Sequence, residues 1–128
     1  MTIRNFLTVA SIVAFAFGLG FFLIPLQLVS FYNVKLEAGG VFVAQLFGAA
    51  LIGFGALNWF ARKVTDSKGM QAIVLANLVG DALGFVIALL GQLSGVGGVN
   101  QFGWSTVAIY LLLALGFAYF QFVKPSAH

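Results

Sequence analysis

The sequence predicts an all-α membrane protein, with four transmembrane helices in an antiparallel bundle, on three observations. Hydrophobic residues make up 62% of the 128 residues. Only six Lys or Arg and three Asp or Glu are present, whereas a soluble domain of this length has roughly 30 charged residues. The apolar residues form long runs, and four helices of about 20 residues each fill most of the chain. We therefore expect a single transmembrane domain over residues 1–128.

The first span is expected over residues 3–24, an apolar run that Pro25 ends because proline continues a helix only with strain. The triplet Ala14-Phe15-Ala16 within this run resembles a signal-peptide cleavage site, but no polar segment follows it. We therefore expect a retained span. Polar and apolar side chains alternate over residues 26–37, which predicts an interfacial segment with Tyr32 at headgroup depth.

Three further spans follow along the chain. The second is expected over residues 40–60 and the third over residues 69–92, with the most polar loop of the chain between them. A glycine-rich loop comes next, and we expect it to be irregular because glycine favours extended and left-handed turns over helix. The fourth span is expected over residues 104–123 and ends at Lys124-Pro125.

Basic residues are distributed unequally between the two ends of the predicted bundle. One side holds Arg4, Arg62, Lys63, Lys68 and Lys124, and the other side holds Lys35 alone. Cytoplasmic loops carry an excess of Lys and Arg, so we expect both termini in the cytoplasm. The same placement, singly at span ends, points to membrane lipid rather than nucleic acid as the partner of these charges.

Residue types that carry metal or covalent chemistry are scarce. The chain has no cysteine, and its one histidine is His128. The spans therefore contain no thiolate or imidazole ligand, and we expect no metal and no cofactor, although a bound lipid is compatible with the sequence. Intramembrane catalysis needs a nucleophile with a base, a metal cluster or paired carboxylates. None of these is evident, and we expect no enzyme.

Small residues in helical register predict where the helices touch. Lipid tails are as apolar as leucine, so spans associate through close backbone approach and interhelical hydrogen bonds. The third span carries small residues at a spacing of four, and the second carries a shorter, shifted series. These residues are Ala72, Ala76, Gly80, Gly84 and Ala88 in the third span and Gly40, Ala44, Gly48 and Gly53 in the second. We expect the two spans to pack on these rows, against each other or against a second copy. Phe residues cluster in the first and last spans, which contain fewer Gly, and we expect these two spans to be the more lipid-exposed.

Asp81 stands out because it lies near the middle of the third span. An ionised carboxylate at the bilayer centre costs roughly 2.5–3.5 kcal/mol on insertion scales, and no Lys or Arg lies within a span. We expect a protonated carboxyl group that forms hydrogen bonds, since desolvation disfavours the charged form. Asn77 lies one turn away, and Tyr110 of the fourth span lies at a similar depth. Gln45 of the second span is a more distant candidate.

Two functions remain open on these residues. In the first, favoured because few polar residues are available to line a path, Asp81 holds helices together. The protein is then a non-enzymatic membrane protein that acts by association, as a homo-oligomer or as an accessory subunit of a larger membrane complex. In the second, it is a small proton- or ion-coupled transporter or channel that uses Asp81, because intramembrane acids commonly mark such paths.

One stretch of the chain resembles a known group of proteins. It runs from Phe42 to Arg62, FVAQLFGAALIGFGALNWFAR, and follows Pro25 and the Tyr32-Asn33-Val34 turn. In composition and spacing it is similar to small uncharacterised bacterial four-span membrane proteins. The resemblance covers mainly the first two spans and contains no catalytic motif. It implies a location in a bacterial inner (cytoplasmic) membrane but no activity.

Overall fold

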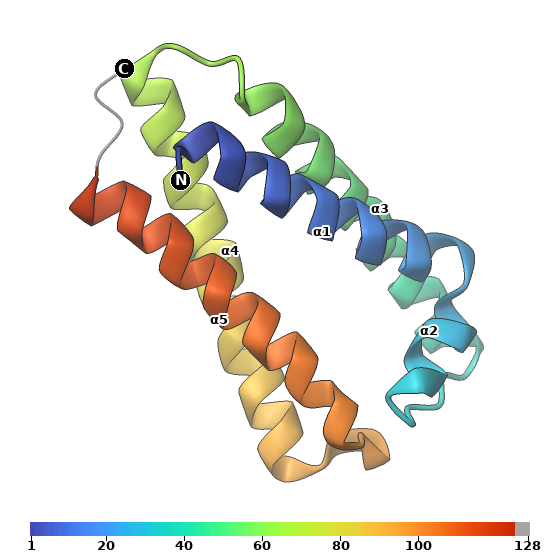
Figure 1. Cartoon of the computed structure of the whole chain (residues 1–128). Coiled ribbons are helices and arrows are strands. Elements are labelled where there is room, and N and C mark those ends of the chain that lie inside the picture. Colours follow the sequence, from blue (N-terminus) through green and yellow to red (C-terminus); the bar gives the residue numbers. More distant parts are fainter. Residues whose placement is uncertain (125–128) are drawn as a thin grey trace.

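The computed structural model describes residues 1–124, so His128 and Pro125 lie outside the described residues. This part of the chain is helical and contains no strand. Figure 1 shows the helices in chain order. They are α1 (Ile3–Leu23), α2 (Pro25–Phe31), α3 (Ala38–Ala61), α4 (Ser67–Ser94), the 3-10 turns η1 (Val96–Gly98) and η2 (Gln101–Gly103), α5 (Trp104–Ala118) and the π-helical turn η3 (Tyr119–Val123).

Four helical segments are long and apolar enough to cross a membrane. They are α1, α3, α4 and the continuous segment Gln101–Val123, and their most apolar windows have mean hydropathies between 1.9 and 2.3. The predicted class is confirmed, and the chain is an integral membrane protein. The helix bounds lie within three residues of the predicted spans, where the fourth span is the continuous segment Gln101–Val123. Helix α2 occupies the first part of the expected interfacial segment.

Local chemistry sets the ends of these helices. The Asp66 side chain accepts a hydrogen bond from the backbone N–H of Gly69 (2.8 Å) and so caps the start of α4. Pro25 occupies the first turn of α2, where a helix does not need the N–H that proline lacks. Gly95 ends α4 with a φ of 67°, in the left-handed region that favours glycine. Two further glycines of this loop also have positive φ, in agreement with the expected irregular connection.

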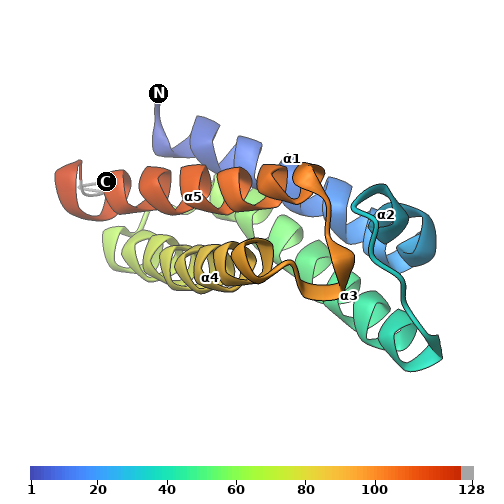
Figure 2. The same cartoon turned by 90° about the horizontal axis from the view of Figure 1, so that it is seen from below.

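The long helices form two antiparallel pairs, α1 with α3 and α4 with α5 (Figures 1 and 2). The first pair approaches closely at Gly48, where an added Cβ atom would lie 2.6 Å from the backbone nitrogen of Phe22. In the second pair, Gly84 lies against the ring of Tyr110 and has no room for a side chain. Glycine therefore permits the closest contact in each pair, as expected where packing must replace the hydrophobic effect.

The pairing differs from the expectation that the second and third spans pack on each other. Helices α3 and α4 touch far less than the members of the two pairs do. Gly48 faces α1 and Gly84 faces α5, whereas a Cβ atom on Gly53 or Gly80 would meet no atom within 4 Å. A row of small residues indicates a close contact, but it does not say which helix makes that contact.

The rest of the predicted rows lies at or near the surface. Ala72 and Ala76 are exposed, and Ala44 and Ala88 are half-buried. Gly40 has contact only with the side chain of Leu36, in the segment before its own helix. The open part of the α4 row thus comprises Ala72, Ala76 and Gly80, and its packing on a second copy stays a prediction.

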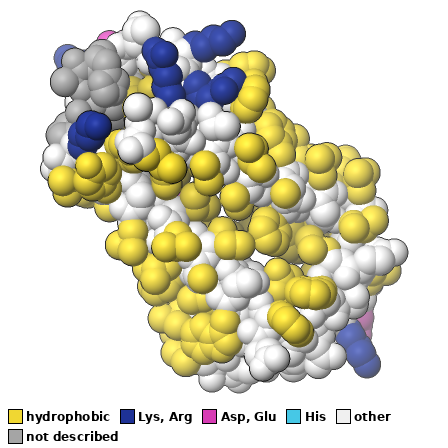
Figure 3. Space-filling view, in the orientation of Figure 1, with side chains coloured by type: hydrophobic (Ala, Val, Ile, Leu, Met, Phe, Trp, Pro, Cys, Tyr) yellow, Lys and Arg dark blue, Asp and Glu magenta, His cyan; other side chains and the backbone are white. Residues whose placement is uncertain are grey.

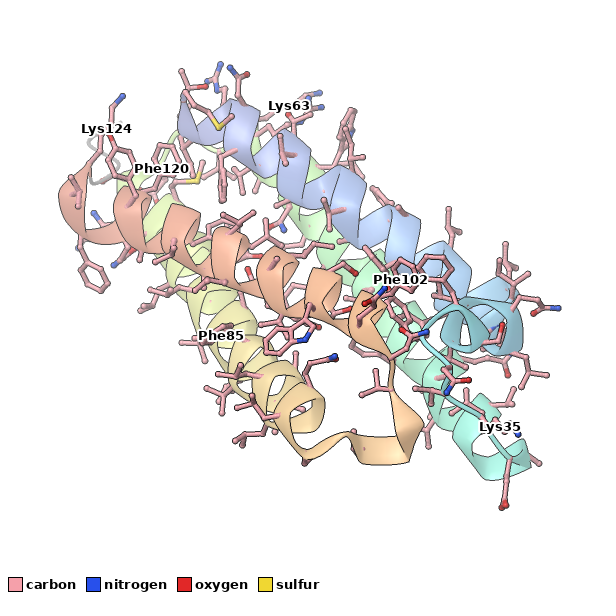
Figure 4. All side chains as sticks on the ribbon, turned by 60° about the horizontal axis from the view of Figure 1, so that its bottom comes forward. Lys35, Lys63, Phe85, Phe102, Phe120 and Lys124 are labelled. Atoms are coloured by element: carbon pink, nitrogen blue, oxygen red, sulfur yellow. The ribbon has the colours of Figure 1, made fainter. Side chains whose placement is uncertain are left out.

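One apolar cluster joins the two pairs at the end where α1 begins and η3 ends, and we call it the core joint. Its buried residues come from all four spans: Ile3, Leu7, Ala10, Ala61, Met70, Val74, Phe117 and Phe120. The ring of Phe6 packs edge-on against Phe117, with centroids 4.8 Å apart, and covers Gly116. Lys and Arg side chains gather at this end of the molecule (Figure 3), where Lys124 lies near Phe120 and Lys63 lies at the same end of the bundle (Figure 4).

The first and last spans are more buried than the other two, contrary to expectation. Of the most apolar window, 22% is buried in α1 and in Gln101–Val123, against 11% in α3 and α4. The reason lies in the core joint, where Phe6, Phe117 and Phe120 fill the space between the two pairs. A phenylalanine ring fills a gap that a smaller side chain would leave empty, so a Phe-rich span is not necessarily a lipid-facing one.

The two pairs touch again at the opposite end, through a contact that we call the loop clasp. The backbone N–H of Asn100 donates to the carbonyl of Tyr32 (3.0 Å). The side-chain amide of Asn33 donates to the carbonyl of Gly98 (3.0 Å). Phe102, visible beside the segment that follows α2 in Figure 4, packs on the last residue of that helix. The loop clasp comprises residues 31–33 and 98–102.

Candidate functional site

A cavity of about 240 Å³ lies between the two helix pairs and is lined by all four spans. It reaches from Ala10, a member of the core joint, to Tyr32 of the loop clasp. Its volume is far above the roughly 10–15 Å³ that admits one water molecule. It lies somewhat below the range for pockets that hold drug-sized molecules, about 300–1,000 Å³. The cavity can therefore hold a small ligand.

The walls of the cavity differ in chemistry. Helices α1 and α3 contribute mainly apolar and aromatic side chains, among them Val13, Phe17, Phe21, Phe47, Leu51 and Phe54. Helix α4 presents Asn77, Gly80 and Asp81, which share one helical face because they are spaced three and four residues apart. Thr106 and Tyr110 come from one face of α5. One wall is thus apolar and the facing wall carries most of the polar groups.

Asp81 supplies the only carboxyl group among the described lining residues. It is half-buried, and within residues 1–124 no hydrogen bond reaches its carboxyl group. Both carboxyl oxygens are accessible from outside the protein. The one fully buried side-chain N or O atom without a hydrogen-bond partner in this range is Oε1 of Gln121, not an oxygen of Asp81. The expected bonds to Asn77 and Tyr110 are not formed, although all three residues line the same cavity. Asp81 therefore offers an unpaired carboxyl group to the space between the helix pairs.

Asn77 is paired with Asn58 of α3 instead. The two side-chain amides donate to each other's oxygens, at 2.8 and 3.0 Å, and their exposed fractions are 6% and 2%. Asn77 also donates to the carbonyl of Ile73 (2.9 Å), so its amide hydrogens are both used. The pair fastens α3 to α4 within the membrane. Sequence reasoning did not place Asn58 at the site, although an amide in an apolar span signals a buried partner.

Gln45 lies outside the cavity. Its side chain is exposed, and its amide donates to the carbonyl of Phe22 (3.2 Å), which ties α3 to the end of α1. Ser11 has a similar role, since its hydroxyl donates to the carbonyl of Gly55 (2.9 Å). Polar groups of the α1–α3 pair thus join its two helices, whereas the carboxyl group of Asp81 in the α4–α5 pair has no hydrogen-bond partner among the described residues.

The arrangement can bind a positive charge together with an apolar body. In the described part of the chain, no group of three or more His, Asp or Glu side chains comes together in a way that could hold a metal ion. The cavity offers one carboxyl group, the hydroxyl-bearing side chains of Thr106 and Tyr110, and aromatic walls. Comparison with protein-family models, with curated proteins and with solved structures finds no match for this chain.

Proposed function

We propose that this protein is a small proton- or ion-coupled transporter or channel, with its path through the interhelical cavity and with Asp81 as the coupling group. One observation carries the proposal: an unpaired carboxyl group faces a cavity between two helix pairs, within the membrane-spanning part of the chain. Intramembrane acids are costly, and those without a structural partner commonly belong to an ion or substrate path. The sequence alone favoured association as the function, because polar residues in the spans are few. Several of these polar residues, however, line the same cavity.

The two ends of the cavity support the same proposal. Transporters alternate access by moving one helical body against another around a fixed site. Here the site lies between two bodies, α1 with α3 and α4 with α5, that meet in the core joint and in the loop clasp. The clasp depends on a few hydrogen bonds near the end of the bundle, and water can replace hydrogen bonds of this kind at little cost.

A flux assay in liposomes tests the proposal. The purified protein is reconstituted with pH- and potential-sensitive dyes, and gradients of H⁺, Na⁺, K⁺ and benzyltrimethylammonium are imposed in turn. We expect protein-dependent flux for at least one gradient and its loss in Asp81→Asn. Asp66→Asn is the matched control, because asparagine also caps a helix and Asp66 lies outside the cavity. The proposal is rejected if no gradient gives flux above protein-free vesicles, or if Asp81→Asn transports like the wild type.

A separate observation supports a second function. The open α4 row lies on a helix that crosses the membrane: Ala72 and Ala76 are exposed, and Gly80, which also lines the edge of the cavity, would have no atom within 4 Å of an added Cβ atom. Small residues at this spacing permit close helix contact. We propose as the alternative that the protein acts without catalysis, by association through this row. It would be a homo-oligomer or an accessory subunit of a larger complex, in a bacterial inner membrane with both termini cytoplasmic.

Two glycines on the same helix separate association from folding. Gly80→Leu adds a side chain where no atom lies within 4 Å, so it should leave the fold intact and abolish the assembly. Gly84→Leu forces a side chain into the ring of Tyr110 and should disrupt the α4–α5 pair itself. Light scattering after gel filtration in mild detergent, together with purification from the native membrane, measures both effects. An unchanged assembly and unchanged co-purifying proteins in Gly80→Leu would exclude association through this row.

A further inference from the structure

The cavity contains one acidic group and no basic group among its lining residues. Besides Asp81 on α4, its titratable residues are Tyr110 on α5 and Tyr32 after α2, and neither α1 nor α3 contributes a charged side chain. A carboxylate in such surroundings needs a compensating positive charge or a proton. Nothing on the described walls supplies that charge, so it must come from outside the protein.

The wall opposite Asp81 is aromatic. Phe17 and Phe21 of α1 and Phe47 and Phe54 of α3 line the cavity. Phe21 and Phe47 pack edge to face with centroids 5.1 Å apart, which fixes their rings across the α1–α3 contact. Aromatic faces attract cations, and most effectively where water is excluded. They also accept apolar surface, so this wall suits an organic group that carries its charge at one end.

Other ligand classes fit the cavity less well. A bare metal cation needs several oxygen ligands, whereas the amides of Asn58 and Asn77 are used by each other and a single carboxyl group remains. An anion would meet the charge of Asp81 with no Lys or Arg on the walls. A neutral apolar molecule would fill the space but leave the carboxylate without a partner.

We propose that the ligand of this cavity is a lipophilic organic monovalent cation. Its charged group lies at Asp81 and Tyr110, and its apolar body lies against the phenylalanine rings of α1 and α3. The inference rests on the proposed transport function and names the class of its substrate. The volume of about 240 Å³ limits the ligand to a small molecule, such as an aryl or alkyl ammonium ion.

Cation and proton are alternatives at the same carboxyl group. When the cation enters, the proton on Asp81 leaves to the aqueous phase, and when the cation leaves, a proton returns. One positive charge is bound in either state, so the net charge of the site does not change. This exchange gives a stoichiometry of one proton released for each cation bound.

Equilibrium binding tests the inference directly. Isothermal titration calorimetry of the purified protein in detergent compares benzyltrimethylammonium with neopentylbenzene, which has the same shape but carbon in place of the charged nitrogen, and with benzoate. We expect saturable binding of one cation per chain, far weaker binding of neopentylbenzene, and no binding of benzoate. Asp81→Asn should weaken cation binding at least about thirtyfold, because a buried charge pair is lost, and should leave neopentylbenzene binding unchanged.

Two further measurements cover the aromatic wall and the exchange. Phe54→Leu should weaken cation binding about fivefold through the loss of a cation–π contact, whereas the control Phe122→Leu, at a side chain outside the cavity, should have no effect. In weakly buffered solution the wild type should release one proton per cation bound, a result that needs no variant to fold.

The outcomes separate this inference from the proposed function. Cation binding with proton release but without flux in liposomes would retain the ligand class and reject transport. Flux of H⁺, Na⁺ or K⁺ without cation binding would retain transport and overturn the ligand class. Equal affinity for benzyltrimethylammonium and neopentylbenzene would also overturn it, because the cavity would then select only for apolar shape.

Discussion

The core joint and the loop clasp hold the same two helix pairs together by different means. The core joint is made of buried apolar side chains from all four spans, with Leu7 and Phe117 fully buried. The loop clasp consists of hydrogen bonds between loop residues, several of which are exposed, and of one ring contact between the exposed side chains of Phe31 and Phe102. Packing is lost abruptly when its surfaces separate, because close-packed interiors do not deform gradually. Hydrogen bonds at the end of the bundle can be exchanged for bonds to water.

This difference indicates which end of the cavity opens. Opening the loop clasp costs less free energy, because its polar groups form hydrogen bonds to water once they are exposed. Opening the core joint costs more, because it leaves a void between the aromatic rings. We therefore expect the two pairs to stay together at the core joint and to separate at the loop clasp. Asp81 lies between the two, on the wall of a cavity that Tyr32 of the loop clasp also lines.

The largest effect is expected in the core joint. Phe117→Ala removes a fully buried ring that packs against Phe6 and should lower the free energy of unfolding by about 2–4 kcal/mol, mostly through the cavity left behind. Phe122→Ala is the control, since that side chain is 68% exposed and should change little. Titration with SDS in mixed micelles measures both. Equal losses for the two variants would show that the core joint does not hold the pairs together.

An intermediate effect is expected for the amide pair between the joints. Asn58→Leu leaves the Asn77 amide without its main partner and should lower stability by about 1–3 kcal/mol. The double variant Asn58→Leu with Asn77→Leu removes both polar groups and should be more stable than either single variant. A double-mutant cycle in the same SDS titration measures this coupling. Additive losses would contradict the reciprocal pairing.

The sequence predicted the class and the helices of this protein well. Charge scarcity and apolar runs require membrane helices, and local signals such as Pro25 and Gly95 end helices wherever they occur. These features depend on neighbours in the chain and not on the rest of the fold. The sequence also identified Asp81, because an acid in an apolar span is costly in any packing arrangement.

The same local reasoning could not predict which residues or helices these side chains contact. The small residues at Gly48 and Gly84 are in close contacts, yet with α1 and α5 rather than with each other's helix. Asn77 pairs with Asn58 of α3 and not with Asp81 of its own helix, and that pairing requires α3 to approach α4 closely at this depth. The local sequence determines which groups a helix face presents, and the packing of the whole bundle determines which groups they contact.

A smaller effect is expected at the loop clasp. Asn100→Ala removes its side-chain bonds to the carbonyl of Phe31 and to the N–H of Phe102, and should cost about 1–2 kcal/mol. Access to the cavity should rise more clearly than stability falls. The chain has no cysteine, so Thr106→Cys places a single thiol in the cavity for maleimide labelling. Labelling should be faster with Asn100→Ala, while an exposed thiol from Ser94→Cys should react at one rate in both backgrounds.

The smallest effect is expected outside both joints, at Gly80. An added methyl group there meets no atom within 4 Å, and alanine is a better helix former than glycine by at most about 1 kcal/mol. Gly80→Ala should therefore leave unfolding unchanged or slightly raise its free energy. Gly84→Ala, one turn along the same helix, should lower it because the methyl group meets the ring of Tyr110. A loss at Gly80 as large as that at Gly84 would mean that another helix covers the open α4 row. The second copy or partner subunit would then belong to the folded unit.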